Sequence, residues 1–133
     1  MSASSFSIKS NASDRELVFS DARRDYFTVE LRGSGVRAVG GVYDAGGLAE
    51  LFAKLATFER PWSGAETWES VEGEFSIAAT CSALGEVRFS VCIRGMLGGP
   101  EQWEVSASLV SELGQLPGIA AHAESFLEVV ASA

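Results

Sequence analysis

Basic residues are scarce in this chain. Ten Lys and Arg stand against eighteen Asp and Glu in 133 residues, so the formal net charge is −8 and the isoelectric point is near 4.6. Nucleic acids and anionic membrane surfaces both attract proteins through clustered Lys and Arg. The only adjacent basic pair here is Arg23-Arg24. The composition therefore argues against nucleic acid and membrane as partners, and it favours either simple solubility or a basic protein partner.

Long apolar runs are missing as well. No segment approaches the roughly 18 apolar residues of a membrane span, and the first fifteen residues lack the apolar stretch of a secretory signal. We therefore expect a soluble, cytoplasmic protein. The length is that of one domain, so residues 1–133 are predicted to form a single domain that folds without a metal or a disulfide.

Cysteine and histidine are nearly absent, with two and one copies respectively. The apolar alternation on both sides of residues 82–86 predicts a hairpin in which opposed residue numbers sum to about 166 or 168. Cys81 then lies near the hairpin tip and Cys92 far down the next strand on the opposite face, so we predict two free thiols. His122 alone excludes metal sites that need several histidines, and no cofactor or metal is expected.

Glutamates are abundant between residues 66 and 74, but they do not resemble a catalytic pair. Glu72 and Glu74 are two apart, so on a strand they share one solvent-facing side. Nothing isolates either carboxyl in an apolar pocket, as a raised pKa would require. The four glycine-rich turns also lack the spacing of a phosphate loop. We therefore predict that the protein is not an enzyme.

The apolar pattern alternates with period two over most of the chain, which is typical of strands. In the clearest case Phe27, Val29 and Leu31 point inward, while Tyr26, Thr28, Glu30 and Arg32 point outward. The pattern predicts strands at 4–10, 15–21, 26–33, 36–44, 67–81, 86–94 and 102–110. Its period changes to that of a helix at 48–58 and again after Pro117.

The resulting order of elements is ββββαβββα. Nearly every strand has one apolar and one polar face, which is typical of an antiparallel sheet covered on one side. The predicted fold class is α+β, with a twisted antiparallel sheet of about seven strands, flat or strongly curved, and two amphipathic helices on its apolar face. Gly40-Gly41 predicts either a bulge or a close approach by another backbone.

Two tryptophans flank the start of the predicted fifth strand. Trp62 lies in WSG at 62–64, and Trp68 lies in TWESVEGE at 67–74. One interpretation is that both rings seal the end of the first helix against the sheet. The other is that one ring stays exposed among the glutamates as an anchor for a partner.

The helix, the WSG loop and TWESVEGE together resemble a family of small uncharacterised bacterial domains. The resemblance covers about a third of the chain strongly and implies no activity or catalytic residues. By size, acidity and layout the family is similar to immunity proteins, which bind and block toxins. That likeness is an analogy, so it implies a kind of partner and no site.

The leading hypothesis is a non-enzymatic binding protein that takes a basic protein, such as a toxin, on an acidic sheet face. The residues predicted to form that face are Tyr26, Glu30, Trp68, Glu72, Glu74, Arg88 and Glu104. The alternative is a small-molecule binder with a pocket between the helices and a curved sheet. Self-association through the edge strand at 4–10 is a further expectation, because few charges guard that edge.

Overall fold

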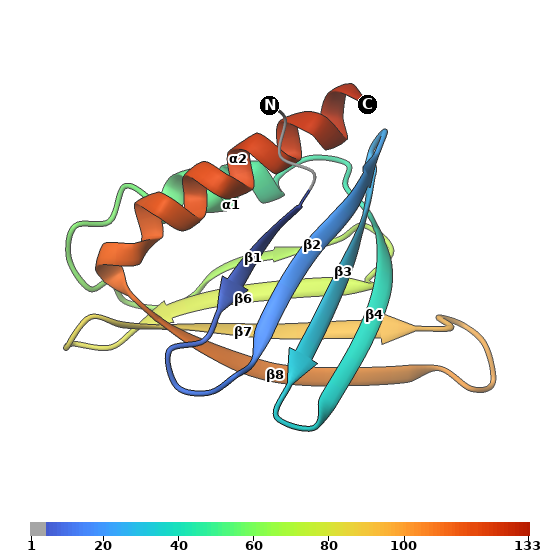
Figure 1. The fold of residues 1–133 in the computed structure, drawn as a ribbon, viewed down its shortest axis with the longest axis horizontal. Coiled ribbons are helices and arrows are strands. Elements are labelled where there is room, and N and C mark those ends of the chain that lie inside the picture. The colour runs from blue at the N-terminus through green and yellow to red at the C-terminus, as the bar shows by residue number, and fades with distance from the viewer. Residues whose placement is uncertain (1–4) are drawn as a thin grey trace.

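The structure, a computed structural model, describes residues 5–133 and contains two sheets with two helices beside them (Figure 1). The predicted first strand began at residue 4, which lies outside the described residues. The elements in chain order are β1 (Ser5–Lys9), β2 (Glu16–Arg23), β3 (Tyr26–Gly33), β4 (Val36–Tyr43), α1 (Leu48–Leu55), β5 (Glu66–Glu69), β6 (Phe75–Cys81), β7 (Glu86–Gly95), β8 (Trp103–Glu112), the 3₁₀ helix η1 (Leu113–Gln115) and α2 (Leu116–Ser132).

The α+β class and the antiparallel pairing are confirmed, but the single sheet of about seven strands is wrong. The first sheet has the order β1-β2-β3-β4 and the second β5-β6-β7-β8. The strands of the two sheets cross steeply in Figure 1. The order ββββαβββα also fails, because the predicted strand at 67–81 is two strands joined by a turn. Two sheets that each have one apolar face can bury both faces by packing against each other.

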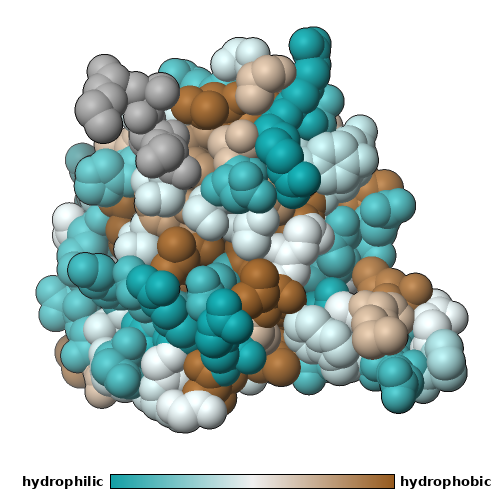
Figure 2. Space-filling model, turned by 45° about the vertical axis from the view of Figure 1, so that its right-hand side comes forward, coloured by the Kyte–Doolittle hydropathy of each residue, from teal (hydrophilic) through white to brown (hydrophobic). Residues whose placement is uncertain are grey.

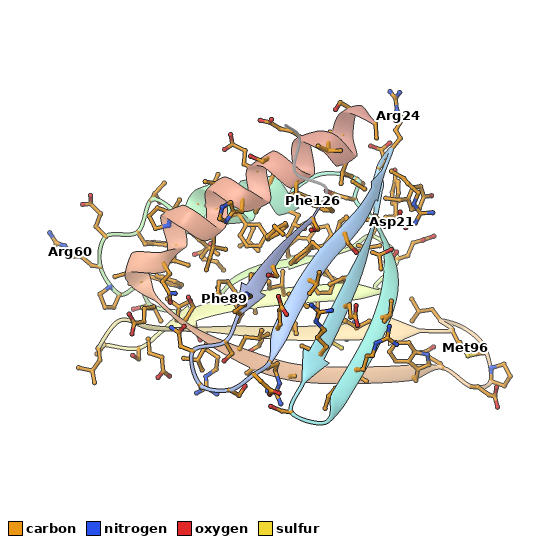
Figure 3. All side chains as sticks on the ribbon, viewed as in Figure 1. Asp21, Arg24, Arg60, Phe89, Met96 and Phe126 are labelled. Atoms are coloured by element: carbon orange, nitrogen blue, oxygen red, sulfur yellow. The ribbon has the colours of Figure 1, made fainter. Side chains whose placement is uncertain are left out.

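The core fills the space between these two inner faces. The predicted alternation in β3 is confirmed, since Phe27, Val29 and Leu31 are fully buried. Phe6, Phe19, Phe27, Phe52, Phe75 and Phe126 form a cluster of rings whose neighbouring centroids lie 4.4–6.5 Å apart. In Figure 3, Phe126 lies between α2 and the first sheet. This cluster joins both sheets and both helices into one core.

The two helices pack against each other along one side of the sheets (Figure 1). Most of both predicted apolar stripes is buried. Leu48, Leu51 and Phe52 of α1 have relative exposures of 6 % or less, and Ala123 and Phe126 of α2 are fully buried. Helix α1 ends at Leu55, well before Pro61. No helix within residues 5–133 has the length and apolarity needed to cross a membrane.

The β6–β7 hairpin has the predicted register. Phe75 pairs with Ile93 and Cys81 with Val87, so opposed residue numbers sum to 168. Cys81 is therefore at the tip and Cys92 far down β7, and both thiols are free as expected. The bulge predicted at Gly40-Gly41 is absent, because the β3–β4 register is continuous there.

Gly40 instead allows β4 to cross β7 closely. A Cβ atom at Gly40 would lie 3.0 Å from a methyl group of Ile93. The close neighbour is thus a side chain of the other sheet and not a backbone. The irregularity of the first sheet lies in β2, where the register shifts between Ser20 and Arg23.

Candidate functional site

The TWESVEGE segment makes the turn between β5 and β6. After Glu69 the chain reverses, and the backbone N–H of Gly73 donates to the carbonyl oxygen of Ser70 at 2.9 Å. Gly73 has a φ of 82°, a conformation that glycine adopts without a steric penalty. Glu72 and Glu74 therefore lie in a turn and do not share a strand face, so that prediction is wrong.

Ser70 is the buried centre of this turn, with a relative exposure of 3 %. Its hydroxyl donates to Glu74 Oε1 at 2.5 Å and accepts a hydrogen bond from the backbone N–H of Phe75 at 3.1 Å. The serine side chain thus satisfies the first backbone donor of β6. Because the hydroxyl is buried, each of these bonds is protected from competition with water.

Glu74 connects three parts of the molecule. Its Oε2 accepts from the backbone N–H of Tyr43 at the end of β4, at 3.2 Å. Its backbone carbonyl accepts from the N–H of Arg94 in β7, at 2.9 Å. Together with Ser70, these contacts attach the β5–β6 turn to both sheets. Glu74 is half-buried and engaged within the fold, so it is a poor candidate for contact with a partner.

Arg94 holds the outer side of the same turn. Its Nε donates to Glu104 Oε1 at 2.8 Å, and its Nη1 donates to the carbonyl oxygen of Gly73 at 2.9 Å. Nη1 also lies 3.7 Å from Glu69 Oε2. The hydrogen bond to Glu104 raises the pKa of Arg94 above its ordinary value. We call Ser70, Glu74, Arg94 and Glu104 the turn network.

Arg94 was missed at the level of sequence, although a signal existed. Continuing the β7–β8 pairing along the chain places Arg94 directly opposite Glu104. The prediction that Arg88 and Glu104 share the outer face agrees with the β7–β8 register, but the two residues are not cross-strand neighbours. Arg88 pairs across to Val110 and lies 3.7 Å from Glu86 in an ion pair.

Two of the predicted residues lie on the other sheet. Tyr26 and Glu30 are on the outer face of β3, whereas Arg88 and Glu104 are on the outer face of the second sheet. Since the sheets pack through their inner faces, these outer faces point away from each other. Glu30 is also neutralised locally, because Arg37 Nε lies 2.8 Å from its Oε2. The seven predicted residues therefore do not form one acidic face.

The sealing interpretation placed both tryptophans at the end of the first helix; Trp62 packs just beyond that end, whereas Trp68 packs against the residues before the helix begins. Trp68 Nε1 donates to the carbonyl oxygen of Gly46 at 3.1 Å, just before α1 begins. A Cβ atom at Gly47 would lie 2.9 Å from the same nitrogen, so the ring rests directly on that glycine. Trp62 stacks on Phe58 with ring centroids 4.4 Å apart. Both rings pack against the core and are only partly buried.

Exposed apolar side chains lie on the two turns at one end of the second sheet, where the turn network also lies. Val71 of the β5–β6 turn is 74 % exposed, and Met96 and Leu97 of the β7–β8 turn are 57 % and 41 % exposed. The β7–β8 turn projects to the right in Figure 1, and Figure 3 labels Met96 there. Figure 2 shows brown residues beside teal ones on this projecting lobe at lower right.

Two exposed carboxylates lie on the same two turns. Glu72 and Glu101 are exposed and form no ion pair with any residue from 5 to 133. Tyr26 is linked to this end through Tyr43, because the two rings lie tilted with centroids 5.2 Å apart and the Tyr43 N–H donates to Glu74. We call Tyr26, Val71, Glu72, Met96, Leu97 and Glu101 the turn-end surface.

A separate cavity lies where α1 begins. It has a volume of about 330 Å³ and is bounded by the end of β4, the start of α1 and the last turns of α2. Asp25 and Asp44 are among its lining residues. Burial raises the pKa of Asp44, and the charge of Asp25 adds to that effect. Within the described part of the chain, no three His, Cys, Asp or Glu side chains are close enough to share a metal ion.

The comparisons with known proteins agree with the resemblance to an uncharacterised family. No curated protein matches the chain, and no solved structure does. A family model matches nearly the whole chain, including the segment that carries WSG and TWESVEGE. The chain therefore belongs to the family of unknown function DUF6228, whose model matches residues 8–130.

Proposed function

We propose that this protein is a non-enzymatic binding protein that takes a basic protein partner on its turn-end surface. The observation that carries the proposal is that exposed Val71, Met96 and Leu97 lie on the same two turns as Glu72 and Glu101, which form no ion pair with any residue from 5 to 133. Apolar anchors inside a charged rim are a common architecture of protein interfaces. An immunity-type inhibitor of a basic toxin is one form that such a protein would take.

The distribution of charge supports a basic partner at this end. Residues 1–43, which include the whole first sheet, carry six Lys and Arg against five Asp and Glu. Residues 44–133 carry four against thirteen. The negative field thus comes from the helices, the second sheet and its turns, and it steers a basic protein towards that part of the molecule.

The test is a pull-down from a lysate of the source organism with three tagged baits, at low and high salt. The first bait is the unaltered protein and the second carries Glu72→Lys and Glu101→Lys. The third is a matched control that carries Glu124→Lys and Glu128→Lys, two exposed positions on α2. Both variants change the net charge equally, so they separate a specific surface from bulk charge.

We expect a basic protein that the first and third baits retain at low salt and that the second bait loses. Higher salt weakens its retention, because exposed charges are screened. With the purified partner, the turn-end variant lowers the association rate by about tenfold or more. Equal losses with the second and third baits, or no loss with either, would contradict the turn-end surface.

The cavity at the start of α1 supports a second candidate, a site for a small cation. Its volume of about 330 Å³ is near the lower end of ligand pockets, and Asp25 and Asp44 supply negative charge. A thermal-shift screen with small amines tests it. A ligand at 100 times its Kd stabilises the folded state by about 2.7 kcal/mol. Stabilisation that Asp44→Asn abolishes would favour this function over protein binding.

A further inference from the structure

Strand β1 is an edge of the first sheet, and no strand within residues 5–133 pairs with its other side. The N–H of Ser10 donates to the carbonyl of Arg15 at 2.9 Å, which makes Ser10 and Arg15 a hydrogen-bonded pair. Such pairs alternate along an antiparallel ladder, so Phe6 and Ile8 direct their backbone groups towards β2. The N–H and carbonyl groups of Ser7 and Lys9 point away from the sheet. Among residues 5–133, no hydrogen bond from another element reaches them.

The edge of β8 is different, because the β1–β2 turn covers it. Val110 N–H donates to Ser10 Oγ at 3.1 Å, and its carbonyl accepts from Asn11 N–H at 2.7 Å. The carbonyl of Ser108 accepts from Arg15 Nη1 at 2.8 Å. Covered edges of this kind prevent unwanted strand pairing. The free groups of β1 therefore contrast with an edge in the same molecule that is capped.

A groove of about 750 Å³ runs beside the free edge. All five residues of β1 line it, and Gln115, Ile119 and His122 line it on the side of α2. In Figure 1, β1 lies at the edge of the first sheet and α2 passes its upper end. A strand added to a sheet lies about 4.8 Å from its neighbour. The groove also extends over the outer face of the sheet, where Glu16, Val18 and Arg32 line it, so an added strand would lie along the open side of β1.

The two sides of the groove differ in chemistry. Phe6 and Ile8 are buried on the inner side, where Ile119 is partly buried. Lys9 is exposed on the outer side and forms no ion pair with a described residue, although its charge helps to lower the pKa of Glu16. This part of the molecule lacks the negative excess of the rest, so an acidic side chain is favoured next to Lys9.

We propose that the β1–α2 groove binds an extended peptide by strand addition, with acidic residues on its outer side and β-branched apolar residues on its inner side. Its backbone pairs with the free groups of Ser7 and Lys9. Acidic side chains then lie beside Lys9, and apolar ones face Ile119. This site is independent of the turn-end surface, and it selects a partner of the opposite charge.

The probe is a labelled, end-capped pentapeptide Glu-Val-Glu-Val-Glu, with Lys-Val-Lys-Val-Lys as its control. Binding is measured by fluorescence anisotropy. Ser7→Pro removes the outward N–H without breaking a ladder bond, which edge strands tolerate. Ser7→Ala keeps the N–H and removes only the hydroxyl, so it is the matched control. Lys9→Glu reverses the charge beside the bound strand.

We expect the acidic peptide to bind with a Kd of about 1 mM or tighter. Ser7→Pro weakens binding by about tenfold or more, and Ser7→Ala changes it by less than about twofold. Lys9→Glu shifts the preference towards the lysine peptide, a result that does not depend on the proline variant folding.

Several results would overturn the proposal. One is no binding of the acidic peptide at about 1 mM. Another is equal binding by Ser7→Pro and Ser7→Ala when both melt cooperatively. A third is a dimer in sedimentation that Ser7→Pro dissociates while no peptide binds. This last result would assign the groove to β1 of a second copy of the chain.

Discussion

Replacing Ser70 with alanine tests whether the turn network stabilises the fold. The substitution removes the side chain that accepts from the buried N–H of Phe75, and it also removes a donor to Glu74 Oε1. A buried donor left without a partner costs about 1–3 kcal/mol, and a hydrogen bond to a charged group contributes about 1.5–3 kcal/mol. Because both losses come from one atom and are not additive, we expect a total of about 2–4 kcal/mol.

Urea denaturation measures this loss. With an m-value of about 2 kcal/mol per M, the midpoint of unfolding falls by about 1–2 M. Ser90→Ala is the matched control, because Ser90 is exposed on the outer face of β7. Its expected effect is within about 0.5 kcal/mol. A Ser70→Ala midpoint no lower than that of Ser90→Ala would refute the structural role of the network.

Two further substitutions test the core and the cavity. Phe126→Ala should lower the free energy of unfolding by about 3–5 kcal/mol in the same urea assay, because the ring is fully buried against Phe6, Phe19 and Phe27. Burial raises the pKa of Asp44 in the folded state, so ionisation of this carboxyl destabilises the fold as the pH rises through that pKa. Asp44→Asn removes the buried charge and should therefore raise the urea midpoint at pH 7 but not near pH 3. An equal effect of Asp44→Asn at both pH values would contradict burial of the charge as the cause.

The features that the sequence predicted correctly depend on local periodicity. The alternation of Phe27, Val29 and Leu31 fixes which face of β3 is buried, whatever covers that face. The same alternation on both sides of residues 82–86 fixes the β6–β7 register, because a slip by one residue would expose both apolar sets. The free state of Cys81 and Cys92 follows from that register.

The splitting of the predicted strand at 67–81 could not be read from periodicity. TWESVEGEF contains neither proline nor an Asn-Gly pair, and its single glycine is a weak signal of a turn. The reversal depends on Ser70, whose hydroxyl replaces a backbone partner for Phe75. Ser70 can accept from the Phe75 N–H only in the folded turn, so no local sequence pattern predicts this hydrogen bond.

The alternation of apolar residues also did not predict that the strands form two sheets. A strand with one apolar face must be covered, but its sequence does not say whether a helix or another sheet covers it. Gly40 is one sequence signal of the second sheet, since its missing side chain leaves room for Ile93 of that sheet. The predicted acidic face failed for the same reason. Residues assigned to one sheet, such as Glu30 and Glu104, belong to layers whose outer faces point apart.

The glutamates of TWESVEGE thus divide by what they contact. Glu74 binds Ser70 and the Tyr43 N–H, and Glu69 lies beside Arg94, so both are engaged within the fold. Glu72 alone has no such contact with a described residue. The segment can therefore identify the fold while contributing one carboxylate to a partner surface. For this reason Glu72 is tested together with Glu101 of the neighbouring turn, whereas Ser70 and Glu74 are tested by stability.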